Sequence, residues 1–205
     1  MRKILLINGS PHKDGNTYRA LQEVVKGVGD EIQTEIVWIG NQAIRGCIGC
    51  GACAKKGNGL CVFNDDICNE MILKMREADG LVVGSPVYYG TPAGQVLCLI
   101  HRMFYAGGAD VQNKPAAAIT VCRRGGATAA FQTLQMPFQM MNMPLATSQY
   151  WNIAYGRSAG EVAEDEEGLQ TMRRLGRNLA WMVKNLNRDE LNEPWEERKW
   201  THFIR

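Results

Sequence analysis

Residues 3–26 have the sequence KILLINGSPHKDGNTYRALQEVVK, and this stretch decides the fold. Its first six residues form a nearly continuous apolar run, which is typical of a strand buried on both faces at the centre of a parallel sheet. A polar loop follows over residues 9–17, and apolar residues at helical spacing then predict a helix over residues 18–26. The stretch is therefore a strand, loop and helix unit of an α/β protein.

The same alternation of strand and helix patterns continues to the end of the domain. Further strands are expected over residues 32–39, 80–84, 115–121 and 145–154. Further helices are expected after a cap at Asp65 or Asp66, through Leu97 to Phe104, and over residues 127–141 and 161–187. We predict one doubly wound α/β domain with a five-stranded parallel sheet and helices on both faces.

The length and composition suit a single domain with a full core. The chain has 205 residues, of which 45% are hydrophobic. We assign the domain to residues 1–187, with a cysteine-rich insertion at residues 45–63. A tail over residues 188–205 carries Trp195, Trp200, Phe203 and Ile204, and we expect it to pack on the domain or on a neighbouring subunit.

Charge and hydropathy indicate the compartment and exclude some partners. The net charge is +2, and no stripe of basic residues is interleaved with aromatic ones, so we expect no nucleic-acid partner. The longest apolar runs are too short to cross a bilayer, and the first three residues lead into a strand rather than the core of a signal peptide. A cytoplasmic protein without a membrane partner is expected.

A compact group of thiols is the second motif. Cys47, Cys50, Cys53 and Cys61 fall within fifteen residues, a spacing similar to that of bacterial ferredoxins, where the sulfurs converge on one iron-sulfur cluster. A reducing compartment argues against paired disulfides. The spacing favours a cluster, and a tetrahedral zinc site or thiols that bind no metal stay open as alternatives.

The polar loop after the first strand is the first of three candidate binding loops. It lacks the glycine and lysine patterns of the Rossmann and P-loop nucleotide sites. Ser10, Asn16 and Thr17 flank a helix N-terminus, where hydroxyls and backbone amides can wrap a phosphate monoester, and His12 is within reach of the same group. The alternative is an ordinary helix whose N-cap is Asn16 or Thr17.

The two other loops follow the third and fourth strands. The first of them combines stiff backbone, a glycine and two aromatic rings that can flank a planar ligand: Pro86, Val87, Tyr88, Tyr89 and Gly90. The second brings backbone amides and two guanidiniums to a helix start, which suits an anionic or carbonyl-rich ring edge: Arg123, Arg124, Gly125 and Gly126. Plain packing and solvated surface charge are the alternatives.

Taken as a set, these motifs resemble those of a known family. Gly9-Ser10-Pro11 with Asn16-Thr17, the run from Ser85 to Gly90, and Gly125-Gly126 are similar to the motifs of flavodoxin-like NAD(P)H-dependent FMN reductases. The cysteine run further resembles the iron-sulfur flavoprotein branch of that family. The resemblance spans about residues 3–154.

The resemblance implies a sheet order of 2-1-3-4-5 and an FMN cofactor. It implies that the phosphate lies at Ser10, Asn16 and Thr17, that the ring lies against residues 86–90, and that the pyrimidine edge faces residues 124–126. It also implies a homodimer or homotetramer, and a [4Fe-4S] centre on the four cysteines. The gap of seven residues before Cys61 is at the long end of the branch's pattern.

These expectations combine into one function. Hydride from NAD(P)H would reach the flavin, with Arg123 or Arg124 stabilising the anion that develops, and electrons would pass, through the cluster where it is present, to a protein, quinone, oxygen or aromatic acceptor. A flavodoxin-type electron carrier or redox sensor without NAD(P)H turnover is the alternative. Electron carriers surround the flavin with acidic groups, so the two arginines favour the enzyme.

Overall fold

The structure is a computed structural model that describes residues 1–188, 190, 196, 197, 199 and 201. The hydrophobic residues expected to pack the tail, namely Trp195, Trp200, Phe203 and Ile204, lie outside the described residues. In chain order the elements are β1 (Lys3–Asn8), α1 (Asn16–Val28), β2 (Gln33–Trp38), α2 (Ala52–Lys56), α3 (Cys68–Glu77), β3 (Gly80–Tyr88), β4 (Thr91–Pro92), α4 (Gly94–Gly107), η1 (Gly108–Val111), β5 (Ala116–Cys122), α5 (Ala127–Met140), β6 (Ile153–Tyr155), η2 (Glu161–Glu164) and α6 (Glu166–Asn185).

Five parallel strands form the sheet in the order β2-β1-β3-β5-β6. Counted without the two-residue β4, this is the predicted order 2-1-3-4-5, so the predicted fold class is confirmed. The central strands are buried on both faces, as the apolar run at Lys3–Asn8 predicts. None of the helices among the described residues is long and apolar enough to cross a membrane.

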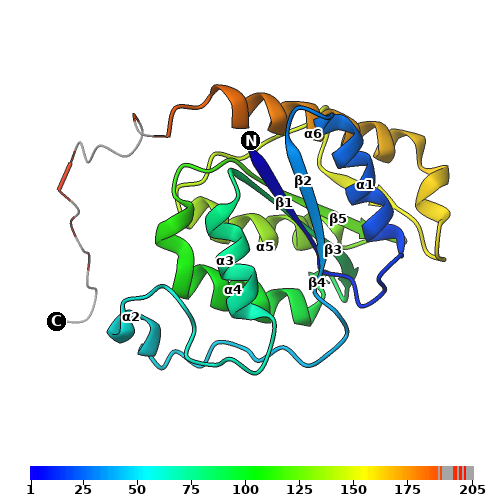
Figure 1. The fold of residues 1–205 in the computed structure, drawn as a ribbon. Helices are drawn as coiled ribbons and strands as arrows, with labels where there is room; N and C mark the ends of the chain where they lie inside the picture. Colours follow the sequence, from blue (N-terminus) through cyan, green and yellow to red (C-terminus); the bar gives the residue numbers. More distant parts are fainter. Residues whose placement is uncertain (189, 191–195, 198, 200, 202–205) are drawn as a thin grey trace.

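Helices cover both faces of the sheet and divide the core into two main clusters (Figure 1). α1 and α6 pack together on one face, where Leu21, Val24 and Leu175 meet the outward side chains of β1 and β3. α3, α4 and α5 cover the other face, with Met71, Leu99 and other apolar residues at helical spacing. The segment before α3, which carries α2, extends below α3 and α4 in Figure 1.

The third strand is longer than predicted. β3 continues to Tyr88 and pairs antiparallel with β4, so most of the expected loop is a hairpin. Tyr89 and Gly90 form its tip with φ angles of 52° and 79°. Positive φ at both central residues is typical of a type I′ turn, whose twist matches that of the flanking strands.

The predicted strand at residues 145–154 is mostly wrong, because β6 covers only Ile153–Tyr155. Leu145 makes an isolated parallel bridge with Ala116, after which the chain leaves the sheet. It returns at Asn152, whose side-chain amide donates to the carbonyl oxygen of Ala118 at 3.1 Å in place of a strand amide. The last helix likewise begins later than predicted, because Asp165 caps it by accepting from the amide of Gly168.

Two buried charges support the helices. Glu23 of α1 pairs with Lys26 and with Arg173 of α6; burial acts to raise its pKa, but these two cations outweigh burial and hold the pKa below the usual value. Lys114 is buried and donates to the last carbonyls of α3, those of Met75 and Arg76. Burial lowers the pKa of Lys114 to about 8.

Candidate functional site

A cavity of about 510 Å³ opens at the carboxyl ends of the strands. Its walls come from the loops after β1 and β6, from the end of β3, and from the end of β5 with the residue that follows it. It therefore lies beside the point between β1 and β3 where the strand order reverses, which is where open α/β sheets bind ligands. A volume of this size is typical of small-molecule and cofactor pockets. The lining residues are Ser10, His12, Gly15, Asn16, Thr17, Pro86, Val87, Tyr88, Val121, Cys122, Arg123, Gly156, Arg157 and Ala159.

The loop after β1 is held in shape by its own hydrogen bonds. The side chain of Asn8 accepts from the amide of Ser10 at 3.2 Å and donates to the carbonyl of Lys13 at 2.9 Å. The indole of Trp38 donates to the carbonyl of Ser10 at 2.8 Å. The hydroxyl of Ser10 accepts from the amide of His12 at 3.1 Å, so its own proton is left to donate to an anion.

The start of α1 favours a phosphate site over an ordinary capped helix. The N-cap is Gly15, which offers no side-chain oxygen, so the first amides of the helix have no side-chain acceptor from the cap. Thr17 and Ser10 are both buried at this end of the cavity. A helix N-terminus with open amides and two hydroxyls attracts a dianion.

Asn16 does not cap the helix. Its side-chain oxygen accepts from the amides of Gly160 at 2.9 Å and Val162 at 3.3 Å, and its side-chain nitrogen donates to the carbonyl of Ser158 at 2.9 Å. Asn16 thus joins the start of α1 to the segment after β6, which closes the same side of the cavity. Its direct contact with a phosphate stays a prediction.

The hairpin after β3 supplies the second wall. The hydroxyl of Ser85 donates to the carbonyl of Pro86 at 2.8 Å and accepts from the amide of Ala93 at 2.9 Å, which fixes both ends of the hairpin. Pro86, Val87 and Tyr88 line the cavity, and their contact with a flavin ring stays a prediction. Tyr89 and Gly90 do not line it, because the turn directs the Tyr89 ring into solvent, where it is fully exposed.

The end of β5 and the first residue after it supply the third wall. Cys122 and Arg123 line the cavity, whereas Arg124, Gly125 and Gly126 lie outside its wall. Gly126, with a φ of 86°, still supports that wall, because a Cβ there would lie 2.7 Å from the Cα of Gly90. Burial raises the pKa of the Cys122 thiol, so this side chain meets the cavity as a neutral group.

The sequence analysis missed the wall that follows β6. Gly156, Arg157 and Ala159 line the cavity from a segment that no motif singled out. The backbone amides of Arg157 and Ser158 donate to the carboxylate of Glu161 at 2.6 and 2.9 Å, which shapes this segment. A lone arginine in a glycine-containing loop gives no pattern from which its place at the cavity could be predicted.

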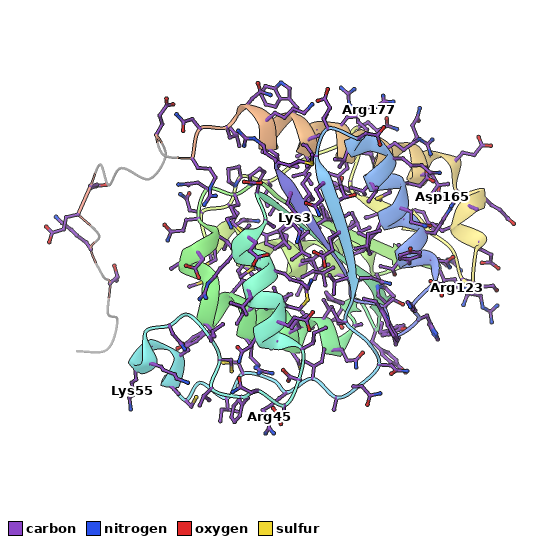
Figure 2. The ribbon with its side chains drawn as sticks, viewed as in Figure 1. Lys3, Arg45, Lys55, Arg123, Asp165 and Arg177 are labelled. Atoms are coloured by element: carbon purple, nitrogen blue, oxygen red, sulfur yellow. The ribbon has the colours of Figure 1, made fainter. Side chains whose placement is uncertain are left out.

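The four cysteines share one pocket, separate from the cavity. Cys47, Cys50, Cys53 and Cys61 line it together, and all four are free thiols. The other lining residues are Ile48, Gly51, Val62, Phe63, Arg102, Tyr105 and Ala106. In Figure 2, Arg45 and Lys55 mark this loop on one side of the molecule, and Arg123 marks the cavity on the other.

The residues that line the pocket are of the types that bind metals. Among the described residues, no group of three or more His, Cys, Asp and Glu side chains is placed so that it could hold a metal ion. By their chemistry, four cysteines on one pocket, beside the buried guanidinium of Arg102, are donors that a negatively charged iron-sulfur cluster takes, and a zinc site stays open as the alternative. The sequence analysis did not single out Arg102. Its place between Leu99 and Met103, on the apolar face of the predicted helix, could have indicated that it is buried.

Comparison with known proteins gives a family match and two similar proteins. The NADPH-dependent FMN reductase family matches residues 2–158. An iron-sulfur flavoprotein of Methanocaldococcus jannaschii is 34% identical over 191 residues, which cover 89% of this chain and 97% of that protein. An iron-sulfur flavoprotein of Methanosarcina thermophila is 32% identical over 199 residues, which cover 92% and 100%.

Solved structures agree with the fold. A flavodoxin, WrbA-like protein from Agrobacterium tumefaciens superposes with a TM-score of 0.63 at 16% identity, covering 90% of this chain and 98% of the other. The family match, the two relatives above 30% identity and the cavity at the strand ends agree with one another. The chain therefore belongs to the NADPH-dependent FMN reductase family, in its iron-sulfur flavoprotein branch, and is an FMN-dependent oxidoreductase.

Proposed function

We propose that the protein oxidises NAD(P)H with its FMN and passes the electrons, through a [4Fe-4S] cluster on the four cysteines, to a protein, quinone, oxygen or aromatic acceptor. The observation that carries the proposal is the cavity at the carboxyl ends of the strands. The helix start with Ser10 and Thr17 suits the phosphate of FMN, the wall of Pro86, Val87 and Tyr88 suits its ring, and Arg123 suits the negative charge that develops on that ring. The chemistry that bound FMN would supply is to accept a hydride and then to give up its electrons.

The residues of the chain would position the cofactor and stabilise charge on it. Ser10 and Thr17, with the first amides of α1, would hold the phosphate. Pro86, Val87 and Tyr88 would hold the ring, and Tyr88 is partly exposed, so that the mouth beside it stays open to a second substrate. Arg123 would bring positive charge to the wall where negative charge develops on the ring.

Mixing with reduced pyridine nucleotides tests the first half of the proposal. In a stopped-flow experiment without oxygen, NADPH or NADH should bleach the flavin absorbance of the FMN-loaded protein. Replacement of Arg123 by Gln should slow that bleaching about tenfold to a hundredfold, as expected for a lost charge that stabilises the transition state, while Arg124→Gln should change it little, since Arg124 lies outside the cavity wall. Failure of both nucleotides to bleach the flavin would favour the electron carrier or redox sensor.

Iron analysis tests the second half. Protein purified without oxygen should contain about four irons per chain and show a broad absorbance shoulder beyond the flavin bands. Cys50→Ser should remove the iron and the shoulder and leave FMN bound, because Cys50 lines only the cysteine pocket. Cys98→Ser is the matched control, since Cys98 is a free thiol on α4 outside that pocket. Protein that stays free of iron after reconstitution would refute the cluster.

We also propose that the protein is a homodimer or homotetramer. Four large apolar side chains are exposed on α5 and on the segment before β6, where an interface would cover them: Met136, Met140, Tyr150 and Trp151. Light scattering of the FMN-loaded protein should give the mass of two or four chains, and the mass of one chain would contradict the proposal.

A further inference from the structure

Arg102 is a buried cation on a helix face that otherwise carries core residues. Its exposed fraction is 1%, and Leu99 and Met103 beside it on α4 are fully buried. A guanidinium is costly to remove from water unless its hydrogen bonds are all made inside the protein. The partners of Arg102 therefore indicate its purpose.

All three nitrogens of the guanidinium donate hydrogen bonds to the cysteine loop. Two of them bond at the neck of this loop, which we define as the place where Arg45 enters it and residues 63–66 leave it. Nη1 donates to the carbonyl of Arg45 at 3.1 Å and to the carboxylate of Asp66, and Nη2 donates to the carbonyl of Phe63 at 3.2 Å. Asp66 accepts in turn from the amides of Arg45 and Cys68, both at 3.0 Å. Arg102 and Asp66 thus join the chain just before Cys47 to the chain just after Cys61.

The third nitrogen reaches a sulfur. Nε of Arg102 donates to Sγ of Cys61 at 3.3 Å. The guanidinium of an arginine does not lose its proton in proteins, and Asp66 pairs with it here, so Arg102 is a cation at every working pH. A permanent positive charge with an N–H directed at a ligand-type sulfur is an arrangement that adjusts iron-sulfur potentials.

The same helix joins the two sites. α4 begins at Gly94, directly after the hairpin that lines the cavity, and the amide of Ala93 is fixed by Ser85. Eight helical residues later, about 12 Å along the axis, it presents Arg102 to the cysteine pocket. α4 thus runs from the hairpin at the cavity wall to the cysteine pocket.

We propose that Arg102 is a positioning residue of the cysteine pocket: it closes the neck of the loop, donates to the sulfur of Cys61, and raises the reduction potential of the cluster held there. The inference rests on the cluster in the proposed function. Its physical reason is that a reduced cluster carries one more negative charge than an oxidised one, so a nearby cation and an N–H bond to sulfur stabilise the reduced form more.

The test is a potentiometric titration of the reconstituted, FMN-loaded protein, followed by the absorbance of the cluster. Arg102→Gln should shift the redox equilibrium at least tenfold towards the oxidised cluster, which is a potential about 59 mV lower for one electron. Iron per chain should fall as well, because the neck of the loop loses its clamp.

Arg45→Gln is the matched control. Arg45 lies on the same loop, and its side chain pairs with Asp65, but it is half exposed and bonds to no sulfur. Its guanidinium lies 4.5 Å from the ring centroid of Phe63, but its charge is screened by solvent, so its loss should shift the potential much less than Arg102→Gln does. Arg102→Lys keeps the charge without the planar fork, and we expect a potential between those of the wild type and Arg102→Gln.

The outcomes separate the inference from the proposed function. If the wild type holds no iron, the cluster and the inference both fail. If the wild type holds the cluster and Arg102→Gln has the same potential as Arg45→Gln, the inference is overturned and the cluster stands. If Arg102→Gln does not fold or loses its iron, Arg102→Lys decides, and a potential equal to that of the wild type overturns the inference.

Discussion

Replacement of Gly126 by Ala tests whether the loops after β3 and β5 hold the flavin together. The backbone of Gly126 has a φ of 86°, which costs a residue with a Cβ about 1–2 kcal/mol. The new methyl would also lie 2.7 Å from the Cα of Gly90, roughly 0.8 Å closer than the ~3.5 Å at which two carbon atoms pack. The hairpin tip must therefore move away from the loop.

Both stability and affinity should fall. We expect the free energy of unfolding to drop by about 1–3 kcal/mol, the range for strain and overpacking. A hairpin displaced from the cavity wall should raise the dissociation constant of FMN about tenfold to a hundredfold, which corresponds to about 1.4–2.7 kcal/mol. Quenching of flavin fluorescence measures the affinity, and urea unfolding of the apoprotein measures the stability.

Gly125→Ala is the control for this experiment. A methyl at Gly125 meets no other atom within 4 Å, and its φ is not positive, so both quantities should stay at their wild-type values. A Gly126→Ala protein that binds FMN as tightly as Gly125→Ala would refute the reasoning, because the contact with Gly90 would then have no bearing on the cavity.

Three further predictions concern the loop after β1 and the two buried charges, Lys114 and Glu23. Replacing Ser10 and Thr17 together by Ala should weaken FMN binding by about 1.5–3 kcal/mol for each charged hydrogen bond lost, and unchanged affinity in a fluorescence titration would place the phosphate elsewhere. The pKa of Lys114 is lowered to about 8, so the folded state binds fewer protons than the unfolded state between that pH and the usual lysine value near 10.5. As pH rises through this window, the free energy of unfolding of the wild type should increase by up to about 3 kcal/mol relative to that of Lys114→Met, as measured by urea unfolding. Parallel pH profiles of the two proteins would contradict this. The pKa of Glu23 is lowered, so its contribution to the free energy of unfolding is present above the usual glutamate value and is lost as pH falls. Glu23→Gln should lower the free energy of unfolding by about 2 kcal/mol at neutral pH and by less in acid. A loss of stability that does not depend on pH in the same assay would count against the ion pairs.

Part of the site could be predicted from the sequence because its signals are local. The polar loop after the first strand holds Ser10, His12, Asn16 and Thr17 within eight residues, and the cysteines lie within fifteen. The structure brings each group to one cavity or pocket. What failed were features that depend on distant partners, such as the continuation of β3 beside β5, where Pro86 pairs with Val121, and the late start of the last strand, which follows the bond of Asn152 to Ala118.

The sequence by itself determined the fold class, because apolar runs and helical spacings are properties of short segments. A strand that is apolar on both faces must be covered on both faces, as it is in a parallel sheet between two layers of helices. It also determined which thiols and hydroxyls are available. Only the tertiary structure decided that Asn16 joins the segment at 158–162, that Arg157 reaches the cavity, and that Arg102 closes the cysteine loop. Asn16 and Ser158 are 142 positions apart in the sequence, and Cys61 and Arg102 are 41 positions apart. Such contacts follow from how the helices and strands pack, which no local pattern encodes.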